Sequence, residues 1–134
     1  MFLDACAIVS IITAEPTAPA YERALADVDE ASTSILAAWE AIAILSRFDK
    51  LNVSFPEAEI VVLDWLDARA IPLREPVSPR RVLALATDVA QKHGVGKRAL
   101  SSLDCFHYAY AKALGQPLLT LDQRLRQTDV PTYP

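Results

Sequence analysis

A single charged residue, Glu40, interrupts the apolar run LAAWEAIAIL at residues 36–45. On a helix, Leu36 and Ile44 would lie one turn before and after it, so the carboxylate would project from an apolar stripe. An unpaired carboxylate in such surroundings is strongly destabilising unless it takes up a proton. Because Glu40 lies in the middle of the predicted helix, it cannot cap either end. The pattern therefore predicts a buried partner for Glu40, either an arginine or a cation.

Three aspartates lie where strands are predicted to end or helices to begin. Asp4 follows the first apolar segment, Asp122 ends the segment PLLTL, and Asp104 falls in the first turn of a helix predicted from LDCFHYAYAKALG. Ligand sites in open α/β sheets lie beyond the carboxyl ends of the strands, so a parallel sheet would direct at least Asp4 and Asp122 into one crevice. Each aspartate also has a purely structural interpretation, as a cap for the helix or turn at which it lies.

Several carboxylates cannot share a crevice as bare anions, because like charges raise one another's pKa and destabilise the fold. Hard divalent cations resolve this conflict, since Mg²⁺ and Mn²⁺ prefer oxygen ligands and keep several bound waters. Such an ion orients a phosphodiester, converts a bound water into a nucleophile and stabilises the leaving oxygen. Together, Asp4, Glu40, Asp104 and Asp122 predict a Mg²⁺ or Mn²⁺ site for phosphoester hydrolysis.

Helical and extended patterns alternate along the chain. Helices are predicted over 5–12 and 36–48 and within 15–29, 52–70, 77–94 and 103–115, and short strands near 2–4, 31–35, 70–75, 116–122 and 130–133. This alternation favours the α/β class, with a central, mainly parallel sheet of about four to five short strands flanked by helices. The helix that carries Glu40 is apolar on nearly every side and is predicted to be deeply buried.

Composition restricts the class of protein. The 134 residues fit one domain over positions 1–134, and a hydrophobic content of 52 % is enough to build a core. No apolar run approaches the roughly 18 residues of a membrane span, and the opening MFLDACAIVS has an acid and no basic start, so neither a membrane nor secretion is expected. The net charge of −4 argues against a plain electrostatic DNA binder. We expect a cytoplasmic protein in which Cys6 and Cys105 are buried free thiols that act as small hydrophobic residues.

Four segments occur in a recognisable order: FLDACAIVSIITAEP, AWEAIAIL, SSLDCFHYAYAKALGQPLLTLDQRL and TDV. No single motif is specific, but the ordered set resembles the PIN-domain family, in particular its VapC-like toxins of bacterial toxin–antitoxin pairs. The resemblance extends from Met1 to about Val130. It implies a parallel-sheet α/β fold, Mg²⁺- or Mn²⁺-dependent endoribonuclease activity, dimerisation and inhibition by a cognate antitoxin. The family's four acids match Asp4, Glu40, Asp104 and Asp122.

The chain departs from the family at Cys6, where relatives often have serine or threonine two residues after the first acid. A thiol is a weaker hydrogen-bond partner than a hydroxyl, so a role of this position in holding a ligand or water is not carried over. Asp122 is the loosest match among the four acids, because its position shifts among relatives. Asp129 in TDV is a further candidate for an acid near the site.

Three other polar residues have two interpretations each. His107 lies one helical turn after Asp104 and could act as a general acid, although a hydrogen-bonded structural histidine is the commoner case. Lys97 and Arg98 in GVGKR could bind RNA phosphates, although a solvated basic turn is commoner.

The sequence leaves more than one function open. The first is an endoribonuclease toxin that acts on RNA, forms a homodimer or a toxin–antitoxin hetero-oligomer, and requires Mg²⁺ or Mn²⁺. The second is a catalytically silent PIN-like module that only binds a partner protein. A small phosphatase with Asp4 as covalent nucleophile is disfavoured, because it requires a second acid two residues on and the chain has Cys6 there.

Overall fold

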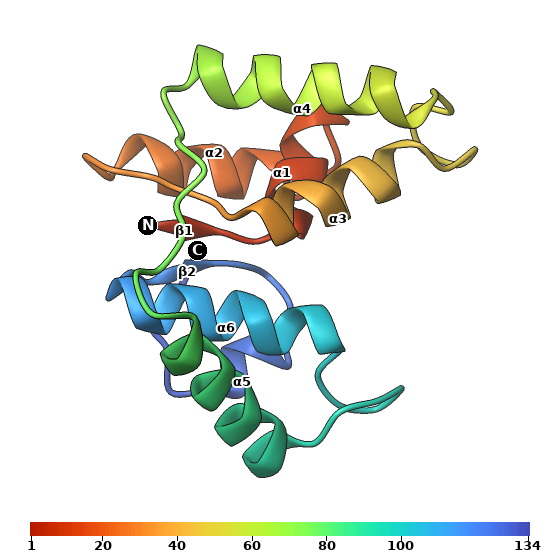
Figure 1. Ribbon diagram of the computed structural model, residues 1–134. Helices are drawn as coiled ribbons and strands as arrows, with labels where there is room; N and C mark the ends of the chain where they lie inside the picture. The colour runs from red at the N-terminus through yellow and green to blue at the C-terminus, as the bar shows by residue number, and fades with distance from the viewer.

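The computed structural model describes all 134 residues, with helices on either side of a small central sheet (Figure 1). In chain order the elements are β1 (Phe2–Leu3), α1 (Ala5–Ile12), α2 (Ala18–Ala26), α3 (Ile35–Leu45), α4 (Phe55–Ala68), α5 (Pro79–His93), α6 (Ser102–Leu114), β2 (Leu118–Leu119), the 3₁₀ turn η1 (Leu125–Gln127) and β3 (Thr132–Tyr133). No helix combines the length and the apolar character needed to cross a membrane.

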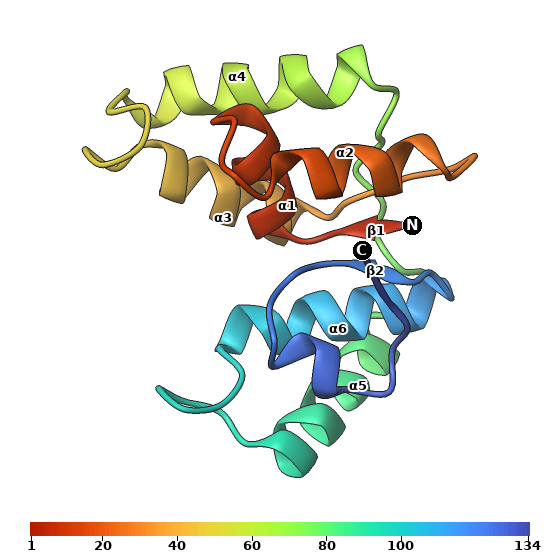
Figure 2. The same ribbon diagram turned by 180° about the vertical axis from the view of Figure 1, so that it is seen from behind.

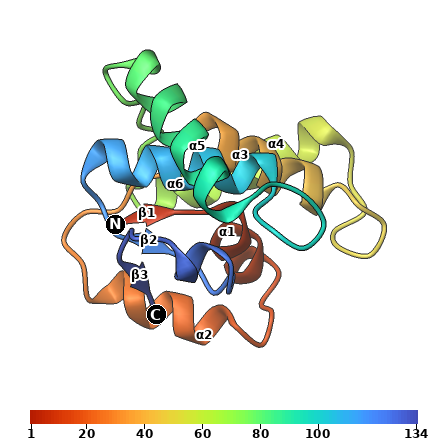
Figure 3. The same ribbon diagram turned by 90° about the horizontal axis from the view of Figure 1, so that it is seen from below.

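The sheet is parallel throughout, with β2 between β1 and β3 (Figure 3). Phe2 pairs with Leu118 in the β1–β2 ladder, and Leu119 pairs with Tyr133 in the β2–β3 ladder. The α/β class and the parallel sheet are therefore as predicted, but the sheet has three strands rather than four to five.

Two predicted strands, 31–35 and 70–75, contribute only single parallel bridges beyond β1. Ser32 bridges to Phe2, and Thr33 bridges to Leu73. Longer ladders are prevented locally, because Ser34 already caps α3 and Pro72 has no backbone N–H to donate.

Alternation along β1 and β2 divides the interior into two clusters, because successive strand residues point to opposite faces. Leu3 and Leu119 belong to the cluster built mainly by α1, α2, α3 and α4, whereas Phe2 and Leu118 belong to the cluster built by α5, α6 and η1. Figures 1 and 2 show these two helical layers above and below the strands.

Serine caps explain where four of the helices begin. Ser34, Ser54, Ser78 and Ser101 each accept a hydrogen bond from the backbone N–H three residues later, and Ser54 and Ser101 belong to complete capping boxes. The sequence itself carries these signals, because a proline lies in the first turn after Ser54 and Ser78, and an acid lies three residues after Ser54 and Ser101. At the other end of α6, Gly115 takes a left-handed conformation (φ 67°) that favours glycine, and the chain turns there toward β2.

Helix α3 differs from its prediction in length and burial. It ends at Leu45, with Ser46 as its C-terminal cap, rather than near residue 48. The face with Ala37, Ala41 and Leu45 is buried, but Trp39 remains 52 % exposed, so the prediction of a deeply buried helix is wrong for one face. The reason is that α1 and α4 cover only part of α3, and Trp39 stacks instead on Phe55 at the surface.

Candidate metal-binding site

Asp4 lies directly after β1, where the chain turns into α1. Its carboxylate accepts a hydrogen bond from the Ala7 N–H at 2.8 Å and so caps that helix. The side chain is almost completely buried, and this burial raises the pKa of Asp4 to about 6 despite hydrogen bonds from Thr120 and Ala7 that lower it. The nearby Glu40 carboxylate raises this pKa further. The fold therefore holds a costly negative charge at the end of β1.

Glu40 lies on α3, on the side of that helix that faces α6. Its Oε2 atom is 2.7 Å from Nε2 of His107, which is buried on α6. The sequence predicted an arginine or a cation as the partner of Glu40. No arginine of the chain meets Glu40, and the side chain in hydrogen-bond contact with it is that of His107. For His107, the commoner of its two interpretations, a hydrogen-bonded histidine, describes the structure.

Asp104 and Asp122 use one carboxylate oxygen each to cap the backbone. Oδ2 of Asp104 accepts from the Ser101 N–H at 2.6 Å, and Oδ1 of Asp122 accepts from the N–H groups of Arg124 at 2.7 Å and Leu125 at 3.2 Å. Their other oxygens make no hydrogen bond within the chain. The structural interpretation of all three aspartates as caps thus holds, and it leaves ligand atoms available on Asp104 and Asp122.

The thiol of Cys6 lies in the first turn of α1, and the charges of all four acids act on it. Cys6 is exposed, so the prediction of a buried thiol is wrong for Cys6, whereas Cys105 is buried. The pKa of the Cys6 thiol is nevertheless raised, first by partial removal of the thiol from water and then by the charges of the four acids. Electrostatic effects of this kind reach only over short distances in a protein. All four carboxylates therefore lie near the Cys6 thiol, although they come from segments far apart in the sequence.

The chemistry of these donors suits a hard divalent cation. All four are carboxylates, and a cation among them would relieve the repulsion that Glu40 exerts on Asp4. No three histidine, cysteine, aspartate or glutamate side chains are close enough to form a ready-made set of metal ligands. Mg²⁺ does not require such a set, because it binds through one or two carboxylates and keeps several waters.

Comparison with known proteins places this arrangement in a family. The family model described as PIN domain matches residues 1–131. The chain belongs to the PIN domain family. It is 37 % identical over 135 residues to Ribonuclease VapC of Mycolicibacterium smegmatis, covering 97 % of both chains, and 29 % identical over 133 residues to Ribonuclease VapC30 of Mycobacterium tuberculosis, covering 98 % of this chain and 97 % of that one.

A solved structure has the same fold. The crystal structure of FitAcB from Neisseria gonorrhoeae superposes with a TM-score of 0.62 at 22 % identity, covering 99 % of this chain and 96 % of that one. The similarity supports the α/β architecture over the whole length of this PIN domain.

Basic residues of this PIN domain lie beside the acids. Lys97 and Arg98 are exposed in the loop between α5 and α6, shortly before Asp104. Arg124, which no sequence motif singled out, donates from Nη2 to the Lys97 carbonyl at 3.1 Å and joins this loop to the segment of Asp122. Its only sequence signal was its position two residues after an acid.

Asp129 takes no part in this group of acids. It accepts hydrogen bonds from the Tyr108 hydroxyl at 2.7 Å and the Lys112 ammonium at 2.6 Å. These two donors hold the pKa of Asp129 at about 2. Asp129 is also not among the charges that act on Asp4 or Cys6.

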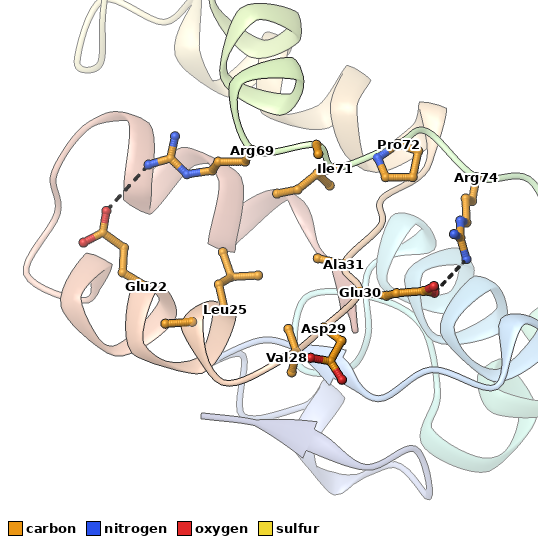
Figure 4. Close-up of a pocket in the computed structure, with 12 residues that line it drawn as sticks. Glu22, Leu25, Val28, Asp29, Glu30, Ala31, Arg69, Ile71, Pro72 and Arg74 are labelled. Carbon is orange, nitrogen blue, oxygen red and sulfur yellow. Dashed lines mark ion pairs between the residues drawn. The ribbon is translucent and has the colours of Figure 1, made fainter.

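A cavity of about 590 Å³ lies elsewhere, lined by the second half of α2, the segment 28–31 that follows it and residues of the segment 69–74 (Figure 4). Its two arginines are each paired with a glutamate, Arg69 with Glu22 at 3.8 Å and Arg74 with Glu30 at 3.6 Å. None of the four family acids lines this cavity. The cavity therefore lies apart from the four acids.

Proposed function

We propose that the protein is an endoribonuclease that requires Mg²⁺ or Mn²⁺ and acts as the toxin of a toxin–antitoxin pair, within a single PIN domain over residues 1–134. The observation that carries the proposal is the position of Asp4 and Asp122 just beyond the carboxyl ends of the paired parallel strands β1 and β2, with Glu40 joined through His107 to α6, the helix that carries Asp104. Relatives named as VapC ribonucleases support the choice of RNA as substrate.

In this proposal Asp4 and Asp104 are the main ligands of the ion, and Glu40 and Asp122 complete the site directly or through waters. A bound ion of this kind supplies Lewis-acid chemistry, since it lowers the pKa of a coordinated water and stabilises charge on the phosphodiester. Hydrogen bonds within the chain hold each carboxylate in place before an ion binds. Backbone N–H groups donate to the three aspartates, and His107 is the partner of Glu40. One of the carboxylates outside the first coordination shell can accept the proton of the attacking water.

The substrate side of the site faces the exposed loop between α5 and α6. Lys97, Arg98 and Arg124 place three cations near the acids and offset the acidic net charge of the chain locally. Single-stranded or looped RNA fits such an open site better than a duplex, because a splayed backbone can approach a small acidic crevice. We propose these three residues as phosphate contacts.

The proposed partners are a cognate antitoxin and a second copy of the chain. Exposed apolar side chains on α3 and α4, among them Ile35, Trp39 and Phe55, are unusual for a protein that works alone. Light scattering of the purified protein, alone and with the product of a neighbouring antitoxin gene, determines both assemblies.

RNA cleavage tests the proposal. Purified protein should cut single-stranded RNA in the presence of Mn²⁺ or Mg²⁺, and Asp4→Asn should abolish cleavage. Chelation of the ion with EDTA should have the same effect. Cleavage at the wild-type rate by Asp4→Asn, or full activity in EDTA, contradicts the proposal.

A catalytically silent interaction module is the second candidate. The observation in its favour is that Asp4, Asp104 and Asp122 each cap the backbone, while no three potential ligands form a ready-made metal set. Titration calorimetry separates the two candidates. Absence of Mn²⁺ binding, together with unchanged partner binding by carboxylate variants, supports the module.

A further inference from the structure

The four family acids are not held in place in the same way. Asp4, Asp104 and Asp122 accept hydrogen bonds from backbone N–H groups at the start of a helix or turn, where such groups are free. Glu40 lies in the middle of α3, where the backbone N–H groups are used within the helix. A carboxylate in this position can be held only by another side chain.

His107 supplies that side chain. Its ring is only 2 % exposed, and Nε2 is 2.7 Å from Oε2 of Glu40. Because a carboxylate can only accept, Nε2 carries the proton and donates it to this hydrogen bond. The two residues are 67 positions apart and join α3 to α6, which pack against each other.

Neither side chain makes a second hydrogen bond within the chain. Nδ1 of His107 is buried and has no partner, so the ring makes a single hydrogen bond, the one to Glu40. Glu40 in turn has no second hydrogen-bond partner in the chain, and its side chain is 23 % exposed. Without His107, the flexible glutamate side chain would be free to change rotamer toward solvent.

We propose that His107 is a positioning residue that holds the Glu40 carboxylate within the acidic site before the ion and RNA bind. This inference rests on the proposed function, in which Glu40 completes the metal site. His107 acts through Glu40 and does not itself contact the ion or the RNA. Residues that orient metal ligands typically contribute about 10–100-fold to metal affinity or activity.

Two substitutions at position 107 test the role of the donor. His107→Gln keeps a neutral N–H donor near the place of Nε2, whereas His107→Leu fills similar space without a donor. We expect His107→Leu to weaken Mn²⁺ binding, measured by calorimetry without RNA, by about tenfold or more. The kcat of His107→Leu should fall while its KM for RNA stays unchanged. In His107→Gln, both the Mn²⁺ affinity and the kcat should be within about threefold of wild type.

A double substitution tests whether His107 acts through Glu40. The Mn²⁺ affinity of Glu40→Gln/His107→Leu should equal that of Glu40→Gln alone. The reason is that Glu40→Gln has already removed the carboxylate that His107 is proposed to hold in place. Wild-type Mn²⁺ affinity in His107→Leu overturns the proposal, and so does an equal loss in His107→Leu and His107→Gln. A further loss in the double variant, beyond that of Glu40→Gln, overturns it as well.

Metal-free crystal structures separate this inference from the proposed function. In wild type and His107→Gln, the Glu40 side chain should occupy one rotamer, and in His107→Leu it should occupy several or turn to solvent. A single unchanged Glu40 rotamer in His107→Leu overturns the positioning role. The Glu40 rotamer can be determined even when the wild-type protein neither binds Mn²⁺ nor cuts RNA. Absence of Mn²⁺ binding and of RNA cleavage would contradict only the proposed function.

Discussion

Asp4 combines a structural and a proposed chemical role in one carboxylate. As a cap, it satisfies the Ala7 N–H and stabilises the start of α1. As a buried anion, it has a pKa raised from its usual 3.8 to about 6, which corresponds to about 3 kcal/mol of folding free energy lost when it is ionised. A neutral side chain of the same shape would keep the cap and remove this cost.

Asp4→Asn should therefore abolish cleavage and stabilise the metal-free protein. At pH 7.5 its free energy of unfolding should exceed that of wild type by about 1–3 kcal/mol. Because the folded wild type binds the Asp4 proton more tightly than the unfolded chain does, wild type gains stability as the pH falls from above 6 to about 4. The difference between the two proteins should shrink over that range. Urea unfolding at several pH values checks this, and a less stable Asp4→Asn at pH 7.5 contradicts it.

Glu40→Gln should reduce cleavage by about tenfold or more and leave the fold intact. The amide oxygen can still accept the His107 hydrogen bond, and the loss of charge removes one cause of the raised Asp4 pKa. Cleavage assays and thermal unfolding measure the two effects. Glu59→Gln, an equal charge change on the exposed face of α4, is the matched control and should change neither. Failure of Glu40→Gln to fold would show that the Glu40–His107 pair is chiefly structural.

The sequence predicted the need for a partner of Glu40 but not the partner's identity. A charge on an apolar stripe is a local signal, whereas the pairing of Glu40 with His107 depends on how α3 and α6 pack. The same limit applies to Arg124, whose contact with the Lys97 carbonyl joins two segments that lie apart in the sequence. Local patterns can thus select a residue, while its contacts depend on the tertiary arrangement.

At the scale of elements, the first turn of α6 connects helix capping to the acidic site. Ser101 and Asp104 form a capping box. Ser101 Oγ accepts a hydrogen bond from the Asp104 N–H at 3.0 Å, and Asp104 Oδ2 accepts one from the Ser101 N–H at 2.6 Å. Any change that loosens this turn also loosens a proposed metal ligand.

Ser101→Ala should lower the free energy of unfolding by about 1 kcal/mol and also weaken Mn²⁺ binding. Ser54→Ala is the matched control, because Ser54 and Glu57 form the same kind of box on α4, a helix that carries none of the four acids. The control should show a similar loss of stability with unchanged Mn²⁺ affinity. Equal Mn²⁺ affinities in Ser101→Ala and wild type would contradict a link between this turn and the site.

Helix starts were predictable because their signals are local, as at Ser54, Ser78 and Ser101. The number of strands was not, because a strand exists only where a neighbour continues the ladder. The segments around Ser32 and Leu73 have strand-like composition but stop after single bridges. The exposure of Trp39 was equally hidden, since an apolar helix gives no sign of which face its neighbours leave uncovered.

At the scale of the whole molecule, the four acids come from segments spread along most of the chain, with Asp4 after β1, Glu40 on α3, Asp104 on α6 and Asp122 after β2. An ion that binds several of them would join the two helical layers. Binding to the folded state alone stabilises a protein by an amount that grows with the logarithm of ligand concentration.

Mn²⁺ should therefore raise the melting temperature of wild type in a concentration-dependent way. At a free ion concentration of about 100 times Kd, the gain is about 2.7 kcal/mol. Differential scanning calorimetry at pH 7.5 measures the shift, and Asp4→Asn should show little or none. An equal shift in both proteins would mean that the ion binds elsewhere.

The most direct test of the central claim is anomalous diffraction from crystals soaked in Mn²⁺. We predict an anomalous peak within coordinating distance of Asp4 and Asp104, with Glu40 and Asp122 bound directly or through water. No peak among these four carboxylates, at a Mn²⁺ concentration that supports RNA cleavage, would contradict the claim.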